Sequence, residues 1–267
     1  MKNLFILLAS LLCYIQTSHA AELFGTVDAV TGEVLVLNTG GEKLRVSTGQ
    51  KIYEGQTIQT AGNGEIHIVT ADSGLLALRP NTSIRIDNYK AKGEPADSTV
   101  LTMIRGAMRS ISGWVAKRNP ASYRINTPTA TIGIRGTDHE TTVIETAAGD
   151  AMPGTYNTVN EGLAIVKSQH GELEVHPGQH VFASREDNVA PRLLARHPEF
   201  FMRRQLKIED RIQARKESLH QQVRKIMENR ADKVRDLPDD KRPEVQTNRE
   251  GFKKRMHERR NREHSKP

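Results

Sequence analysis

Asp138, His139 and Glu140 form a tight polar cluster of side chains that could exchange protons or bind a metal ion. In an extended strand, however, Asp138 and Glu140 face one side and His139 faces the other. Three such neighbours do not converge easily on one ion or one substrate. We therefore interpret the cluster as the polar end of a strand and predict no catalytic residue.

Three residues are candidates for contact with a partner. Arg135 lies between Gly133 and Gly136 and carries a planar guanidinium with five donors. It either pairs internally with Asp138, which we favour, or presents itself to an acidic partner. Trp114, the only tryptophan, follows a glycine in a predicted turn and either stacks on a sugar or partner or anchors the core. Arg135, Asp138 and Trp114 are thus candidate partner-binding residues.

Histidines offer a second possible metal site. His176 and His180 are four residues apart, but the Pro-Gly pair between them favours a turn over a helix, and His170 is the remaining nearby ligand. A zinc site usually needs three or four converging ligands. The sequence also lacks a phosphate-binding glycine loop, a nucleophile elbow and a zinc-protease helix. We predict no metal, no cofactor and no enzymatic activity.

The N-terminus has the form of a secretory signal. Lys2 precedes an apolar stretch over residues 4–15 and a small-residue site, which predicts cleavage after Ala20. About twelve apolar residues are too few to span a bilayer stably. The only cysteine, Cys13, lies in this segment, so the mature chain has no thiol. We expect a periplasmic or secreted protein with no transmembrane segment after cleavage.

The charge of the chain changes near Pro191. Residues 1–191 carry a net charge of −3 and residues 192–267 carry +10. Within residues 21–190, short β-branched runs alternate with turn formers at spacings near ten residues, which predicts a mainly β sandwich or roll of short strands. The strongly basic character of the chain therefore belongs to its C-terminal part.

The β body also repeats itself. The run from Leu44 to Ile52 resembles the run from Leu173 to Val181, and each predicts a strand, a turn and a strand. Gly49 and Gly178 fall where such a turn needs a positive φ. Coincidence between two hairpins is the alternative, because turn chemistry converges on glycine.

The C-terminal part differs in composition. Residues 191–237 predict a long basic amphipathic helix, with Pro198 at its first turn and Pro238 after its end. Residues 238–267 are charged and nearly free of large apolar groups, so we expect disorder. This basic region either faces water or binds an anionic envelope polymer or membrane surface by peripheral contact. Export argues against nucleic acid as its partner.

Four motifs in fixed order resemble the FecR domain family of bacterial extracytoplasmic proteins, over residues 25–140. They are Leu78-Arg-Pro-Asn-Thr-Ser-Ile-Arg-Ile, Ile104-Arg-Gly-Ala-Met-Arg-Ser-Ile-Ser-Gly, Lys117-Arg-Asn-Pro-Ala-Ser-Tyr-Arg-Ile and Thr127-Pro-Thr-Ala-Thr-Ile-Gly-Ile-Arg-Gly-Thr. The regulator that names the family has a cytoplasmic anti-sigma portion and a membrane helix, and we expect neither in this protein. A second departure is Asp72-Ser73-Gly74 in place of Asp-Gly-Ser, which predicts a turn shifted by one residue.

The resemblance implies an exported, stand-alone binding or scaffold module of the cell envelope, in signalling or assembly, with an envelope protein or an anionic envelope polymer as partner. The alternative is an accessory protein or an unrecognised hydrolase that acts on cell-wall or polysaccharide substrates through Asp138, His139 and Glu140.

Overall fold

The structure is a computed structural model, and it describes residues 21–119, 122–147, 149, 151–185, 189–196, 198, 212–213, 216–218, 220–226 and 228–229. The predicted signal segment with its cleavage site at Ala20, and the charged residues 238–267, lie outside this part of the chain. By contacts the chain divides into two compact units, residues 1–223 and 224–267. The first unit contains the whole β body.

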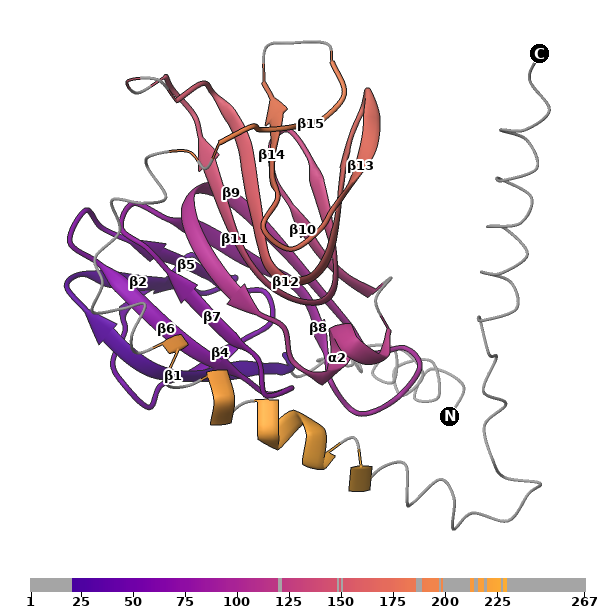
Figure 1. Ribbon diagram of the computed structural model, residues 1–267. Helices are drawn as coiled ribbons and strands as arrows, with labels where there is room; N and C mark the ends of the chain where they lie inside the picture. The colour runs from indigo at the N-terminus through magenta and orange to yellow at the C-terminus, as the bar shows by residue number, and fades with distance from the viewer. Residues whose placement is uncertain are drawn as a thin grey trace, which may run out of the picture. The chain divides into compact units, whose positions relative to one another are not determined.

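The predicted mainly β character is confirmed, because the described residues form fifteen strands (Figure 1). The strands are β1 (Leu23–Thr31), β2 (Val34–Leu37), β3 (Lys43–Arg45), β4 (Lys51–Tyr53), β5 (Thr57–Thr60), β6 (Glu65–Thr70), β7 (Leu75–Leu78), β8 (Ser83–Lys90), β9 (Ser98–Ile111), β10 (Tyr123–Asn126), β11 (Thr131–Ile144), β12 (Gly154–Ser168), β13 (Gly171–Val175), β14 (His180–Ser184) and β15 (Arg192–Leu193). A short helix, α2 (Trp114–Arg118), lies between β9 and β10, where we expected a turn.

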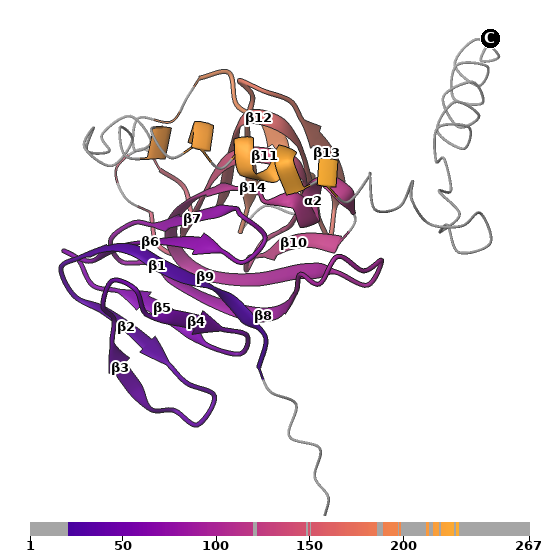
Figure 2. The ribbon, with the colours of Figure 1, turned by 90° about the horizontal axis from the view of Figure 1, so that it is seen from below.

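Hydrogen bonds join all fifteen strands into one network. Its main path runs β15-β14-β12-β11-β10-β9-β7-β6-β1-β4, while β13 pairs with β12 and the group β3-β2-β5-β8 joins at β9. Strand β9 is central because its first half pairs with β8 and β10 and its second half pairs with β7 and β11. Figures 1 and 2 show these strands curving around a shared interior.

One large apolar core fills that interior. Strand alternation supplies it, as in β8, where Ile84 and Ile86 are fully buried, and in β11, where Ile132 and Ile134 are buried two residues apart. Phe24 of β1 contacts Tyr89 of β8 edge-to-face, with ring centroids 5.0 Å apart. The periodicity in the sequence therefore translates directly into the buried face of each strand.

The predicted internal repeat is confirmed in the backbone. Gly49 and Gly178 both have positive φ, at 85° and 79°. Their amides donate to the carbonyls of Val27 and Val159, each at 2.8 Å, so the two turns sit on equivalent strands. The shared hydrogen bonds show that β1-β2-β3-β4 and β12-β13-β14 are built on one plan, in which the long strand β12 takes the place of both β1 and β2.

The described residues do not support one long helix over residues 191–237, of which much lies outside the part of the chain that the structure describes. Arg192 and Leu193 form β15, which pairs with β14, so the β body extends past its predicted end at residue 190. Helical residues are described only at 212–213, 216–218, 220–226 and 228–229. Spaced apolar residues and positive charge predicted a helix, but they could not reveal that the backbone of Arg192 has a strand partner in Phe182. Among the described residues, no helix is long and apolar enough to span a membrane.

At Asp72-Ser73-Gly74 the serine itself has a positive φ, at 60°. Gly74 cannot exchange places with it, because a Cβ there would lie 2.8 Å from the amide nitrogen of Gly113 and from the carbonyl oxygen of Ile111. The chain accepts a non-glycine residue in the left-handed region to keep the close approach at Gly74.

Candidate functional site

A β-bulge in β11 positions the polar cluster identified in the sequence. The register of β11 against β12 shifts between Arg135 and Asp138 and again between Asp138 and His139. Thr137, Asp138 and His139 are consecutive yet all buried, because both faces of β11 are covered beside this bulge. Gly162 of the neighbouring strand β12 lies against the bulge. A Cβ on Gly162 would lie 2.3 Å from the carbonyl oxygen of Gly136. The local sequence therefore needs its glycines to place Asp138.

Asp138 is enclosed by donors from three other segments. Arg109 of β9 donates from Nε and Nη2 to the two carboxylate oxygens, at 3.0 and 2.9 Å. Asn160 of β12 donates at 3.2 Å, and the ammonium of Lys216 donates at 2.7 Å. Burial alone would raise the pKa of Asp138, but the hydrogen bonds and charges of Arg109 and Lys216 outweigh it and hold the pKa at about 2. Asp138 is thus an ionised, fully satisfied carboxylate.

Lys216 brings a helical segment from far along the chain to this carboxylate. Its ammonium also contacts Glu161 at 2.7 Å, and although burial lowers the pKa of Lys216, these two carboxylates raise it above its usual value. One turn earlier, Ile212 is fully buried in an apolar cluster with Leu75, Ala77 and Ile111. Apolar packing and a buried ion pair together dock this segment on the face formed by β7, β9 and β11.

His139 lies on the opposite side of the strand. Its side chain is fully buried, and Nδ1 accepts a hydrogen bond from the amide of Asn157 at 3.1 Å. Burial lowers the pKa of His139 to about 4, so the ring is neutral at neutral pH. Nε2 has no hydrogen-bond partner among the described residues. Asp138 and His139 therefore do not act as a pair, in agreement with the prediction that neighbours in a strand diverge.

The other two candidates have different surroundings. Arg135 is exposed, and none of the described residues forms an ion pair with it. The favoured internal pair between Arg135 and Asp138 is wrong, because Arg109 and Lys216 occupy both carboxylate oxygens. Trp114 is only 4% exposed at the start of α2, so its ring serves the core and offers no surface for stacking.

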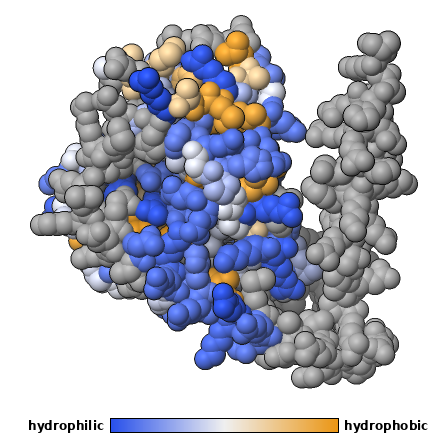
Figure 3. All heavy atoms as spheres, in the orientation of Figure 1, coloured by the Kyte–Doolittle hydropathy of each residue, from blue (hydrophilic) through white to orange (hydrophobic). Residues whose placement is uncertain are grey.

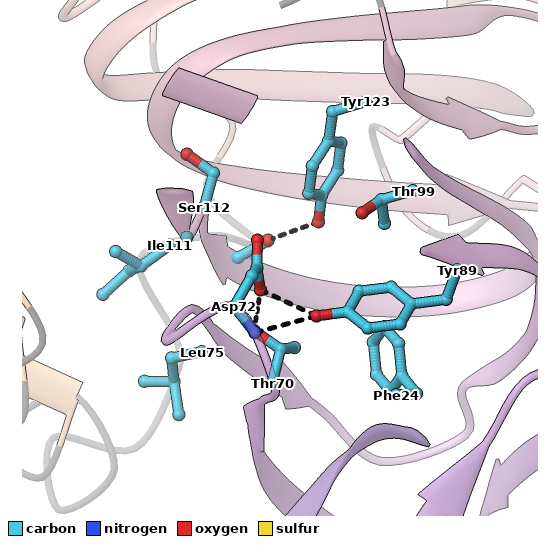
Figure 4. Close-up of a pocket in the computed structure, with 11 residues that line it drawn as sticks. Phe24, Thr70, Asp72, Leu75, Tyr89, Thr99, Ile111, Ser112 and Tyr123 are labelled. Carbon is cyan, nitrogen blue, oxygen red and sulfur yellow. Dashed lines mark hydrogen bonds between the residues drawn. The ribbon is translucent and has the colours of Figure 1, made fainter. Parts of the chain in front are cut away.

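A second buried carboxyl group, Asp72, lies in a small polar cavity (Figure 4). The hydroxyls of Thr70 and Tyr89 donate to it, the latter at 3.1 Å, and the Val115 amide lies at 3.4 Å. None of these groups is a cation, and burial raises the pKa of Asp72. The cavity has a volume of about 10 Å³, which matches one water molecule and excludes an organic substrate.

The histidines considered in the sequence as metal ligands have separate partners. His176 is exposed in its turn and contacts Glu174 at 3.3 Å, while His180 hydrogen-bonds Thr158 at 2.9 Å. Within the described ranges, no group of three or more His, Cys, Asp or Glu side chains is arranged to hold a metal ion.

Sequence reasoning missed Arg109, Asn160 and Lys216, the partners of Asp138. Arg109 lies inside the family motif that begins at Ile104, and its place in that motif was the only sign in the sequence that it has a structural role. Lys216 gave none, because it lies 78 residues from Asp138 in a region rich in basic residues.

The sequence matches a known protein family but no curated protein. The profile of the family described as FecR protein matches residues 56–163. Two crystal structures of a candidate anti-sigma factor from Parabacteroides distasonis ATCC 8503 are similar at 12% and 13% identity, with TM-scores of 0.40 and 0.41. A structure described as a cell surface anchoring domain has 22% identity and a TM-score of 0.23, and the match covers 23% of this chain and 82% of that one.

Each match to the anti-sigma factor structures covers 52% of this chain and 57% of the other. The family match confirms the resemblance but places it at residues 56–163, so that it begins later than the predicted residue 25 and ends later than residue 140, in β12.

Proposed function

We propose that this chain, which carries a FecR domain at residues 56–163, is a non-enzymatic binding or scaffold module of the bacterial cell envelope that acts in signalling or assembly. The enclosure of Asp138 is the observation that carries the proposal. A general acid, a nucleophile or a metal ligand must reach its substrate, whereas Asp138 is 1% exposed and already accepts four hydrogen bonds from three residues. Its chemistry is used to join parts of the fold.

The hydrolase alternative loses its support for the same reason. His139 is fully buried on the other side of the strand, and its low pKa removes the acid form at neutral pH. Asp138 is bound by Arg109 and Lys216, whereas His139 is hydrogen-bonded to Asn157 and Thr141. Asp138 and His139 therefore lie in different environments.

The surface supports binding more than catalysis. Figure 3 shows a mainly hydrophilic face with hydrophobic residues gathered toward its upper end. Arg135, exposed on the strand that carries the most specific family motif, remains our candidate contact for an acidic partner. The net charge of +10 on residues 192–267 suits an anionic envelope polymer or membrane surface.

Site-specific photo-crosslinking tests the Arg135 contact. A photoreactive amino acid replaces Arg135 in the full chain, in cells, and the control replaces Arg105, another exposed arginine of the β body. We expect a discrete crosslinked species from position 135 alone. Equal crosslinking from both positions, or none from position 135, would contradict the proposed contact.

Vesicle co-sedimentation tests the basic region. The full chain and a variant that ends at Val223, which keeps Ile212 and Lys216, are mixed with vesicles of phosphatidylglycerol or phosphatidylcholine. We expect only the full chain to bind, only to the anionic vesicles, and less at high salt, because exposed charges are screened. Binding by the shortened variant, or binding that salt leaves unchanged, would count against an electrostatic role for the tail.

A further inference from the structure

Among the described residues, four strands of the β body pair with a single other strand: β3, β4, β13 and β15. Two of these edge strands match in the internal repeat: β3, which pairs with β2, and β13, which pairs with β12. No other backbone hydrogen bond is formed by Lys43, Leu44 or Arg45, nor by Glu172, Leu173 or Glu174, within the described chain. Each strand therefore presents a row of amide and carbonyl groups to a further strand.

The two edges occupy equivalent positions in the internal repeat. In both units the turn after the edge strand is closed in the same way: the Ser47 amide donates to Gln50 Oε1 at 3.2 Å, and the His176 amide donates to Gln179 Oε1 at 2.8 Å. Figure 2 places β3 and β13 on opposite sides of the β body, and Figure 1 separates β2 from β13 in the same way. The edges of one copy therefore cannot pair with each other.

Their charges are opposite at matching positions. Aligning the two turns sets Lys43 against Glu172 and Arg45 against Glu174, and all four side chains are exposed. The residue between the charges is leucine in both strands: Leu44 is 40% exposed and Leu173 is half-buried. Side chains alternate along a strand, so each edge carries two like charges on one face and one leucine on the other.

We propose that copies of this protein associate head to tail, with β3 of one copy pairing with β13 of the next. In antiparallel pairing Leu44 lies opposite Leu173, Lys43 opposite Glu174, and Arg45 opposite Glu172. Every cross-strand pair is then favourable, and the added backbone hydrogen bonds extend the sheet from one copy into another. This inference does not depend on the proposed function.

Charges on edge strands commonly protect against aggregation. Here the two edges carry opposite charges, so these charges also select which edges can pair. A basic edge repels another basic edge, and an acidic edge repels another acidic edge. Like-with-like pairing is therefore opposed, while the basic edge and the acidic edge attract. Because the contacting surfaces differ, the association is heterologous and forms open chains of copies.

Neighbouring groups limit the contact to three residues on each side. His176 contacts Glu174 at 3.3 Å, and this contact must yield or be shared on pairing. At the other end of β13, a Cβ on Gly171 would lie 3.0 Å from the Cβ of Ala190, so that end is partly covered. A three-residue contact buries little area, which predicts weak, concentration-dependent association.

Analytical ultracentrifugation of the protein as purified from cells tests the proposal, at concentrations up to about 1 mM because small interfaces bind weakly. The basic edge is reversed in Lys43→Glu/Arg45→Glu and the acidic edge in Glu172→Lys/Glu174→Lys. We expect concentration-dependent growth in mass for the wild type, its loss in either reversed variant, and its return when the two variants are mixed. Each variant then carries two edges of one sign, so the mixture alternates.

The matched control is Arg105→Glu/Arg124→Glu, which makes the same change in net charge at two exposed arginines of the inner strands β9 and β10. It should associate as the wild type does. Circular dichroism checks that each variant is folded. If Lys43→Glu/Arg45→Glu does not fold, Lys43→Gln/Arg45→Gln is used in its place.

Three outcomes would overturn the proposal. The first is a wild-type chain that stays monomeric throughout the concentration range. The second is a mixture of the two reversed variants that stays monomeric. The third is association abolished by reversal of β13 but unaffected by reversal of β3, which would assign the acidic edge to another basic segment, such as the C-terminal region.

Discussion

Asp72 and Asp138 are both almost fully buried in the same β body, yet their surroundings drive their pKa values in opposite directions. Asp72 receives hydrogen bonds from two hydroxyls, and burial raises its pKa. Asp138 is buried as well, but Arg109 and Lys216 more than compensate and bring its pKa to about 2. The difference shows that burial alone does not set the charge of a carboxyl group; the cations that the fold brings to it decide.

The origin of those cations also separates the two sites. Asp72 is served by residues of the β body alone, from Thr70 to Val115. Asp138 needs Lys216, which reaches it from a helical segment outside the FecR match. The first site holds a turn in place, and the second joins two parts of the chain.

Replacing Asp138 by Asn is the strongest way to break the comparison. Arg109 and Lys216 would lose their counter-charge in a buried place, and we expect the free energy of unfolding to fall by about 3–5 kcal/mol. Urea unfolding at pH 7 measures it. A loss below about 1 kcal/mol would show that solvent reaches the cluster freely.

The dependence of stability on pH comes next. The folded pKa of His139, about 4, lies below the unfolded value of 6.5, so only the unfolded chain takes up the proton in between. The corresponding stability, about 3 kcal/mol, is present above pH 6.5 and lost as the pH falls to 4. Asp138 continues the loss from 3.8 to about 2, whereas the raised pKa of Asp72 acts with the opposite sign. Between pH 7 and 4.5 the free energy of unfolding should depend less on pH in His139→Gln than in the wild type. An unchanged slope of this free energy against pH would exclude His139 as the cause.

Replacing Lys216 by Met removes one cation and keeps the apolar stem of the side chain. Asp138 keeps both hydrogen bonds from Arg109, so we expect a smaller loss of about 2 kcal/mol. Glu161→Gln is the control, because Glu161 is half exposed and its pair with Lys216 should contribute less than about 1 kcal/mol. Equal losses in the two variants would mean that Lys216 acts mainly through the surface pair.

Replacing Asp72 by Asn should have the smallest effect. No cation loses a partner, and an amide oxygen can still accept from Thr70 and Tyr89, so we expect a loss of about 1 kcal/mol in unfolding free energy at pH 7. A cost equal to that of Asp138→Asn would mean that Asp72 is ionised and paired in the folded state.

Local features of the sequence anticipated most of the fold. Short β-branched runs, the glycines at positions 49 and 178, and the family motifs are local signals, and they predicted strands, turns and the domain. The divergence of Asp138 from His139 also followed from strand geometry. These properties depend on residues that are neighbours in the chain.

Contacts between distant residues account for what was not predicted. The bulge at Arg135–Asp138 depends on the close approach of Gly162 in the neighbouring strand β12. The partners of Asp138 depend on which distant residues the fold brings beside it. Arg135 was the nearer arginine in sequence, yet Arg109, 29 residues away, makes the contact. The predicted start of the helix at residue 191 was wrong for the same reason: Arg192 pairs with β14, and the periodicity of the sequence does not reveal that pairing.

The ion pair between Lys216 and Asp138 has a mechanical consequence. A pull on the chain beyond Val223 is resisted first by the segment that carries Ile212 and Lys216, before any strand of the β body is loaded. Asp138 transfers that load to β9 through the two-pronged contact with Arg109, and β9 is hydrogen-bonded to four other strands. Tension on the C-terminal region would therefore detach a short segment while leaving the sheet intact.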